Sequence, residues 1–168
     1  PRTPRGLGDA LSDIASSEYA RSLGAASGFR RSRPDLSFFP PPGHDPRDPW
    51  RFGGCFALAK AFHRWAGPDR SELVALDWSE EREPPPHEHV LVRIGELYYD
   101  LYGAAPKRTV MRRWNKIWYH ILFPPFRVLV MVPFHAAHAR GIQCPTNLVR
   151  DLERLMVSHL GKPEDWGI

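Results

Sequence analysis

Apolar side chains recur three and four positions apart in four segments of the chain, which is the spacing of one face of a helix. The first segment, residues 9–24, has Asp9 as its expected cap and Gly24 at its end. The others are residues 54–66, residues 108–123, and a C-terminal segment that Thr146 caps and Gly161 ends. We therefore expect helices near both termini and two more between them.

Two runs of alternating apolar residues, 89–94 and 97–102, are separated only by Gly95 and Glu96. A glycine followed by one other residue between two such runs predicts an antiparallel hairpin with a two-residue type II′ turn. Further strands are expected over residues 73–78 and 127–132.

The length of 168 residues suits one domain with a hydrophobic core. Half of the 18 prolines gather in residues 34–49 and 84–86, so these stretches mark connections between elements. The pattern predicts an α+β fold in which the helix over residues 54–66 packs on an antiparallel sheet of three to five strands. Residues 1–30 are expected to form an N-terminal helix and tether to the remaining residues, 31–168.

The formal net charge of +4 favours an anionic partner or substrate surface, although such a charge is also common on proteins that have neither. Residues 1–30 lack the continuous apolar run of a secretory signal. The most apolar stretch, residues 117–134, contains His120, Arg127 and three prolines, which do not suit a membrane span. We expect no transmembrane segment and a protein that is cytoplasmic, or secreted without a conventional signal peptide.

Cys55 follows two glycines at the predicted start of a helix. The glycines allow a sharp turn, and the free N–H groups and positive dipole of the first helical turn favour the nucleophilic thiolate. The same amides could stabilise an oxyanion. Taken alone, Cys55 suits a buried structural cysteine about equally well. His63 lies two turns along the same helix, too far away to act as its base.

The hairpin register supplies a base and its orienter. Leu91 falls opposite Asp100 and His89 opposite Tyr102, so His89 and Asp100 are diagonal neighbours on one face of the sheet. A carboxylate beside a histidine fixes the tautomer and stabilises the imidazolium, as a base for a thiol requires. The competing interpretation is an exposed His–Asp pair. We predict a nucleophile, base and orienter formed by Cys55, His89 and Asp100.

The order of these residues resembles the Cys-His-Asp core of the papain-like and transglutaminase-like superfamily. Gly-Gly-Cys55 opens a helix, His89 heads a strand, and Asp100 lies on the next strand before Leu-Tyr-Gly103. Residues 51–55 are also similar to arylamine N-acetyltransferases, and the compact size resembles bacterial effector deamidases. The similarity covers residues 50–103, about a third of the chain.

The resemblance implies that residues 31–168 are a thiol-active catalytic domain, without a cofactor, that acts on a protein or peptide substrate. The expected activity is acyl chemistry at an amide bond through a Cys55 thioester, as in a thiol protease, a deamidase or a transglutaminase-type transferase. The Cys55 amide would hold the oxyanion together with one donor from residues 44–54. Trp50 is expected to wall the cleft, and Gly54 and Tyr102 are further candidate substrate-binding residues.

Other residues could alter this assignment. His87 could replace His89 as the base, and Asp77 is a reserve orienter. A zinc site is not predicted, because His135, His138 and Cys144 lack a fourth ligand at motif spacing.

The alternative function is a non-catalytic basic binding module for nucleic acid or an anionic surface. It rests on the cations of the predicted helix 108–123, which lie beside three aromatic residues. More often such a pattern is a core helix with a solvated basic side. The cations are Arg108, Arg112, Arg113 and Lys116, and the aromatic residues are Trp114, Trp118 and Tyr119.

Overall fold

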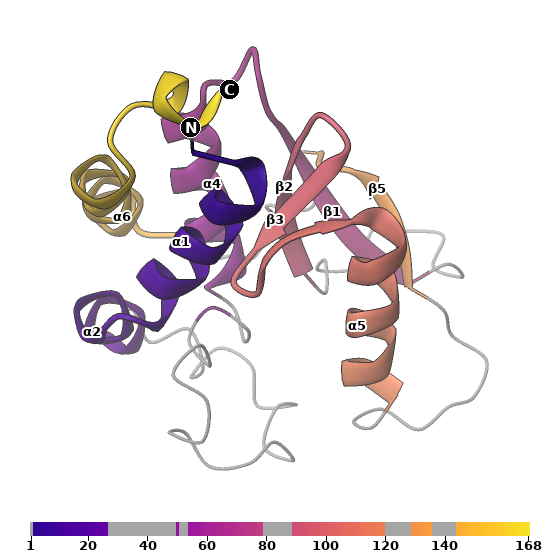
Figure 1. The fold of residues 1–168 in the computed structure, drawn as a ribbon. Coiled ribbons are helices and arrows are strands. Elements are labelled where there is room, and N and C mark those ends of the chain that lie inside the picture. The colour runs from indigo at the N-terminus through magenta and orange to yellow at the C-terminus, as the bar shows by residue number, and fades with distance from the viewer. Residues whose placement is uncertain (1, 27–49, 51–53, 79–88, 120–128, 136–143) are drawn as a thin grey trace.

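The computed structural model describes residues 2–26, 50, 54–78, 89–119, 129–135 and 144–168. Within these ranges five strands form one antiparallel sheet in the order β4-β3-β2-β1-β5 (Figure 1). The strands are β1 (Glu72–Trp78), β2 (His89–Ile94), β3 (Leu97–Asp100), β4 (Gly103–Pro106) and β5 (Leu129–Pro133). The predicted α+β class and the antiparallel sheet are confirmed.

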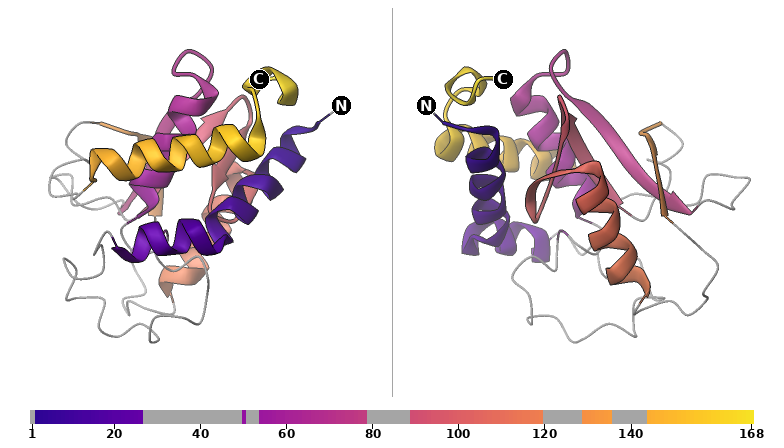
Figure 2. Two further views of the ribbon diagram at one scale, coloured as in Figure 1. Left: turned by 90° about the vertical axis from the view of Figure 1, so that its left-hand side faces the viewer. Right: turned by 45° about the vertical axis from the view of Figure 1, so that its right-hand side comes forward.

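The helices cover both faces of this sheet (Figure 2). Tyr99 of β3 contacts Phe62 of α4, with ring centroids 5.4 Å apart, whereas the neighbouring Asp100 points to the opposite face and contacts Trp114 of α5. Figure 2 shows α1, α4 and α6 grouped on one side and α5 on the other. The helices are α1 (Pro4–Ser16), α2 (Glu18–Ala26), α4 (Cys55–Ala66), α5 (Lys107–Tyr119) and α6 (Thr146–Leu160), and a 3₁₀ helix, η4 (Pro163–Trp166), follows α6.

The single helix predicted over residues 9–24 is wrong, because the chain forms two helices that meet at Ser17. The Ser17 backbone is extended. The Ser17 hydroxyl donates to Ile14 O, and its Oγ atom accepts a hydrogen bond from Ala20 N–H. Serine competes for backbone hydrogen bonds in this way and so ends one helix and caps the next. Thr3, not Asp9, caps α1, and Gly24 lies inside α2.

Helix α4 has the predicted bounds, with Gly54 as its N-cap and Gly67, at φ 97°, as its C-cap. Gly161 ends α6 as predicted, but Pro145 occupies the N-cap position and makes no side-chain cap hydrogen bond, so Thr146 is not the cap. Helix α5 covers the predicted segment as far as Tyr119, and the rest of that segment, to residue 123, lies outside the described residues.

The predicted hairpin register is confirmed where the ladder extends, with Ile94 opposite Leu97 and Val92 opposite Tyr99. Gly95 has φ 58°, and no described non-glycine residue has positive φ, as a type II′ turn requires. The second strand ends at Asp100 and not at residue 102. The chain turns there into β4, an edge strand that the sequence analysis missed.

One hydrophobic core joins α1, α4, α6 and the sheet. Leu7 and Leu11 of α1 are fully buried in it, so this helix is part of the same packed unit as the strands. Gly8 lets the backbone of α1 lie directly against Ala104 of β4. Within the described residues, no helix combines the length and apolarity needed to cross a membrane.

Candidate functional site

Cys55 is the first residue of α4 and lies at the N-terminal end of that helix. It is buried, with only 4% of its surface exposed. Gly54 has φ −83° and ψ −9°, a conformation open to any residue, so a sharp turn at Gly54 is not what places the sulfur. Gly53 lies outside the described residues.

His89 is the first residue of β2, and its side chain is 1% exposed. Its Nε2 atom lies 3.6 Å from Oδ2 of Asp100, and the ring also interacts with Cys55. Because Nε2 faces the carboxylate, Nδ1 is the ring nitrogen left to serve the sulfur. The three predicted residues therefore come together, from the start of a helix, the start of a strand and the end of the next strand.

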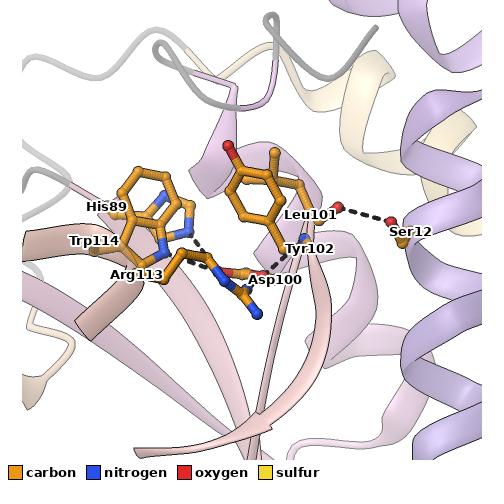
Figure 3. Close-up of polar contacts among 7 residues, drawn as sticks. All are labelled: Ser12, His89, Asp100, Leu101, Tyr102, Arg113 and Trp114. Atoms are coloured by element: carbon orange, nitrogen blue, oxygen red, sulfur yellow. Dashed lines mark hydrogen bonds and ion pairs between the residues drawn. The ribbon is translucent and has the colours of Figure 1, made fainter. Parts of the chain in front are cut away.

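Asp100 makes more polar contacts than the sequence indicated (Figure 3). Its Oδ1 atom accepts a hydrogen bond from the Tyr102 backbone N–H at 2.8 Å and forms an ion pair with Arg113 at 3.2 Å. Its Oδ2 atom accepts from the indole N–H of Trp114 at 2.9 Å, in addition to facing His89. The Trp114 ring also stacks on the imidazole, with centroids 3.7 Å apart and an interplanar angle of 27°. Asp100 is thus an acceptor fixed from several directions.

The electrostatics of the pair follow from these contacts. Burial alone would lower the pKa of His89, but the contacts with Asp100 and Cys55, together with their negative charge, outweigh burial and raise the pKa above its usual value. Burial would raise the pKa of Asp100, but the His89 contact, the Arg113 charge and the Trp114 hydrogen bond lower it overall. The favoured state is an imidazolium beside an ionised carboxylate.

A small cavity of about 10 Å³ lies between the sulfur and the sheet. Cys55, His89 and Asp100 contribute to its lining, and the remaining residues are mainly apolar, among them Leu11 and Tyr99. A volume of this size suits about one water molecule.

The other candidate substrate-binding residues lie in different places. Trp50 is fully buried, and its indole donates to Ala15 O at 2.9 Å, which places it in the core beside α1 and not in the lining of this cavity. Tyr102 is half-buried beside Arg113, whose guanidinium lies 5.0 Å from the centre of the tyrosine ring. Gly54 is buried directly before Cys55.

The reserve orienter, Asp77, does not share the face of the sheet that carries the pair. Leu76 lies directly opposite His89, so the next residue, Asp77, points to the other face of the sheet. His87 lies outside the described residues. His63 contacts Ser71 through Nδ1 at 2.7 Å. Among the residues that the structure describes, no three His, Cys, Asp or Glu side chains gather as a metal site.

Arg113 and Trp114 are the functional residues that the sequence analysis did not assign to the site. The helical periodicity placed Trp114 on the apolar stripe of α5, but nothing in the spacing indicated that its N–H would reach a carboxylate on β3. Arg113 was grouped with the surface cations, whereas its side chain is only 26% exposed and turns toward Asp100. An aspartate inside a predicted strand, where this residue is disfavoured, was the available signal that further donors were needed.

Comparisons of the chain with protein-family models, with curated proteins and with solved structures found no match.

Proposed function

We propose that the protein is a cysteine-dependent enzyme of acyl chemistry at an amide bond, with a papain-like or transglutaminase-like core. One observation carries the proposal. His89, itself buried, interacts with Cys55 at a helix start and with the ionised Asp100 on the neighbouring strand. A thiol, an imidazole and a fixed carboxylate in this order form the usual arrangement for activating a cysteine.

In the reactive state the Cys55 proton is already on His89, and the thiolate sulfur attacks the substrate carbonyl carbon. The new S–C bond leaves an oxyanion, which the Cys55 backbone N–H at the start of α4 can stabilise. Collapse of this intermediate breaks the C–N bond, and His89 returns the proton to the leaving amine. Water or a second amine then attacks the thioester and releases the Cys55 sulfur.

Asp100 contributes by staying ionised throughout. It accepts hydrogen bonds from Tyr102 N–H, Arg113 and Trp114. Because these donors stabilise its negative charge, Asp100 does not take the proton from His89. Hydrolysis would make the protein a peptidase or deamidase, and transfer to an amine would make it a transglutaminase. A protein or peptide is the substrate class in each case.

The test is competitive alkylation with a limiting amount of iodoacetamide near neutral pH. Burial raises the pKa of the Cys144 thiol, so that cysteine is a slow internal reference. We expect Cys55 to be modified at least about tenfold faster than Cys144, and His89→Gln to remove the difference. Slow and equal modification of both cysteines would contradict the proposal.

A non-catalytic basic binding module is the second candidate function, and one observation favours it. Arg108, Arg112 and Lys116 are exposed at intervals of four residues along α5, which contains no acidic residue. The binding of a single-stranded oligonucleotide should then weaken steeply with salt. The triple substitution of these cations by Gln should abolish that binding while leaving the alkylation rate of Cys55 unchanged.

A further inference from the structure

The two oxygens of Asp100 have different sets of partners. Oδ1 contacts the Tyr102 N–H and one nitrogen of Arg113, and Oδ2 contacts the indole N–H of Trp114 and Nε2 of His89. The His89 contact, at 3.6 Å, is the longest of these four. Asp100 is therefore held more closely by its other donors than by the base that it is proposed to orient.

Arg113 competes with His89 for this carboxylate. A guanidinium is a planar fork that prefers to bind both oxygens of a carboxylate side by side. Here Arg113 contacts only Oδ1, because the indole N–H of Trp114 already occupies Oδ2 at 2.9 Å. The ring of the same tryptophan lies face to face with the imidazole, so it also limits how His89 can rotate.

We infer that Trp114 is a positioning residue that reserves Oδ2 of Asp100 for His89 against capture by Arg113. Without the indole N–H, the carboxylate is free to turn and form a two-point contact with Arg113. The negative charge beside Nε2 is then neutralised, and the imidazolium loses its partner. The inference rests on the proposed function for its meaning in catalysis, but the arrangement can be measured without any turnover.

The decisive measurement is the pKa of His89, followed by NMR of the imidazole in the full chain and assigned by the signal that His89→Gln removes. The charged or titratable groups that face the His89–Asp100 pair in the described residues are Cys55 from α4, Arg113 from α5 and Tyr102 after β3. Trp114→Phe keeps an aromatic ring against the imidazole but removes the N–H. We expect this variant to lower the His89 pKa by about 1 pH unit.

Without competition from Arg113, electrostatics alone predicts that Trp114→Phe raises the His89 pKa instead of lowering it. A lost donor leaves Asp100 more basic, and a more basic carboxylate would raise the His89 pKa. Arg113→Gln should show this effect, because it removes a cation beside Asp100 and leaves Trp114 in place. In the double variant Trp114→Phe/Arg113→Gln, the competitor is gone and the His89 pKa should return to the wild-type value or above it. Opposite shifts in the two single variants, with rescue in the double variant, identify competition for Oδ2.

The matched control is Trp166→Phe, which removes an indole N–H that donates to Leu160 O at 2.7 Å, far along the chain from the pair. It should leave the His89 pKa unchanged. If Trp114→Phe does not fold, benzothienylalanine at position 114 replaces the N–H by sulfur and keeps the size of the ring system. A His89 pKa that stays the same or rises in the folded variant would overturn the inference.

The test of Trp114 can succeed or fail independently of the test of the proposed function. If Cys55 and Cys144 of the wild-type protein react equally slowly with iodoacetamide, the proposed function fails, and the His89 pKa values still decide the role of Trp114. If Cys55 reacts fast and the His89 pKa does not fall in Trp114→Phe, the enzyme proposal stands and the positioning role fails.

Discussion

The Nε2 atom of His89 lies 3.6 Å from Oδ2 of Asp100, and both side chains are only 1% exposed. Two ionisable groups withdrawn this far from water are costly unless each stabilises the charge of the other. The hairpin brings them together because β2 begins at His89 and β3 ends at Asp100, so both lie at the same end of the sheet. Substitutions at this pair should therefore change the His89 pKa, the free energy of unfolding and the alkylation rate of Cys55.

Replacing Cys55, the proposed nucleophile, should change the pKa of His89, the proposed base. The hydrogen bond and negative charge of Cys55 raise the pKa of His89, so Cys55→Ala should lower that pKa by about 1 pH unit while abolishing any activity. The substitution removes one buried sulfur, and we expect the free energy of unfolding to fall by about 1 kcal/mol or less. An unchanged His89 pKa in a folded Cys55→Ala protein would show that the sulfur does not contact the ring.

Replacing the orienter should affect both stability and reactivity. The amide of Asp100→Asn must direct an NH₂ group toward donors on either side, because Oδ1 accepts from Tyr102 N–H and Oδ2 accepts from Trp114. The cost should be about 3 kcal/mol, since one partner of a buried pair is lost. The His89 pKa should fall, and alkylation of Cys55 near neutral pH should slow.

Asp77→Asn is the comparison for this experiment. Asp77 lies on the opposite face of the sheet from His89, so its substitution should leave the His89 pKa and the neutral-pH alkylation rate unchanged. Slower alkylation in Asp77→Asn, with no change in Asp100→Asn, would assign the orienting role to β1.

The candidate site could be predicted from the sequence where local rules fix the geometry. Gly95 and Glu96 set the turn, the turn sets the register, and the register sets which side chains share a face with Asp100. The donors from α5 could not be predicted, because their contact with Asp100 depends on how a separate helix docks on the sheet. Trp114 reads as an ordinary core residue in the helical pattern, and only the fold shows where its N–H points.

The fold could be predicted less well at its edges. Strand β4, with the sequence Gly-Ala-Ala-Pro, has none of the β-branched or aromatic residues that favour strands, so its pairing with β3 comes from tertiary context. The division of the N-terminal helix at Ser17 depends on hydrogen bonds of one hydroxyl, which the apolar periodicity does not register. Neither element supplies Cys55, His89 or Asp100.

The stability of the protein should depend on pH through the same pair. The pKa of His89 is raised above 6.5, so its contribution is fully present below about pH 6.5 and is lost as the pH rises through the folded-state value. The pKa of Asp100 is lowered below 3.8, so its contribution is present above about pH 3.8 and is lost as the pH falls through the folded-state value. The stabilisation is complete between these limits.

Urea denaturation across the pH range can measure this window. The difference in unfolding free energy between the wild type and Asp100→Asn should be largest near about pH 5, and it should shrink as the pH rises through the folded-state pKa of His89. A difference that stays constant as the pH rises would mean that Asp100 does not raise the pKa of His89 in the folded protein.

The attachment of α1 to the sheet can be tested at two glycines on one helix. A Cβ added to Gly8 would overlap the backbone nitrogen and the Cβ of Ala104 on β4, and neither atom belongs to a flexible side chain that could move aside. A Cβ added to Gly6 would meet only Thr3 Oγ1 at 3.4 Å and the Trp166 ring at 3.7 Å, which are ordinary contacts. A Gly→Ala substitution should therefore change the free energy of unfolding in opposite directions at Gly8 and Gly6.

Gly8→Ala should lower the free energy of unfolding by about 1–3 kcal/mol, because α1 must move away from β4 to admit the methyl group. Gly6→Ala should raise it by up to about 1 kcal/mol, because alanine loses less backbone entropy than glycine in a helix. Leu11 lines the cavity beside Cys55, so displacement of α1 in Gly8→Ala should also alter the alkylation rate of Cys55, which Gly6→Ala should leave unchanged. Equal stability of the two variants in urea would show that α1 does not rest on β4 through Gly8.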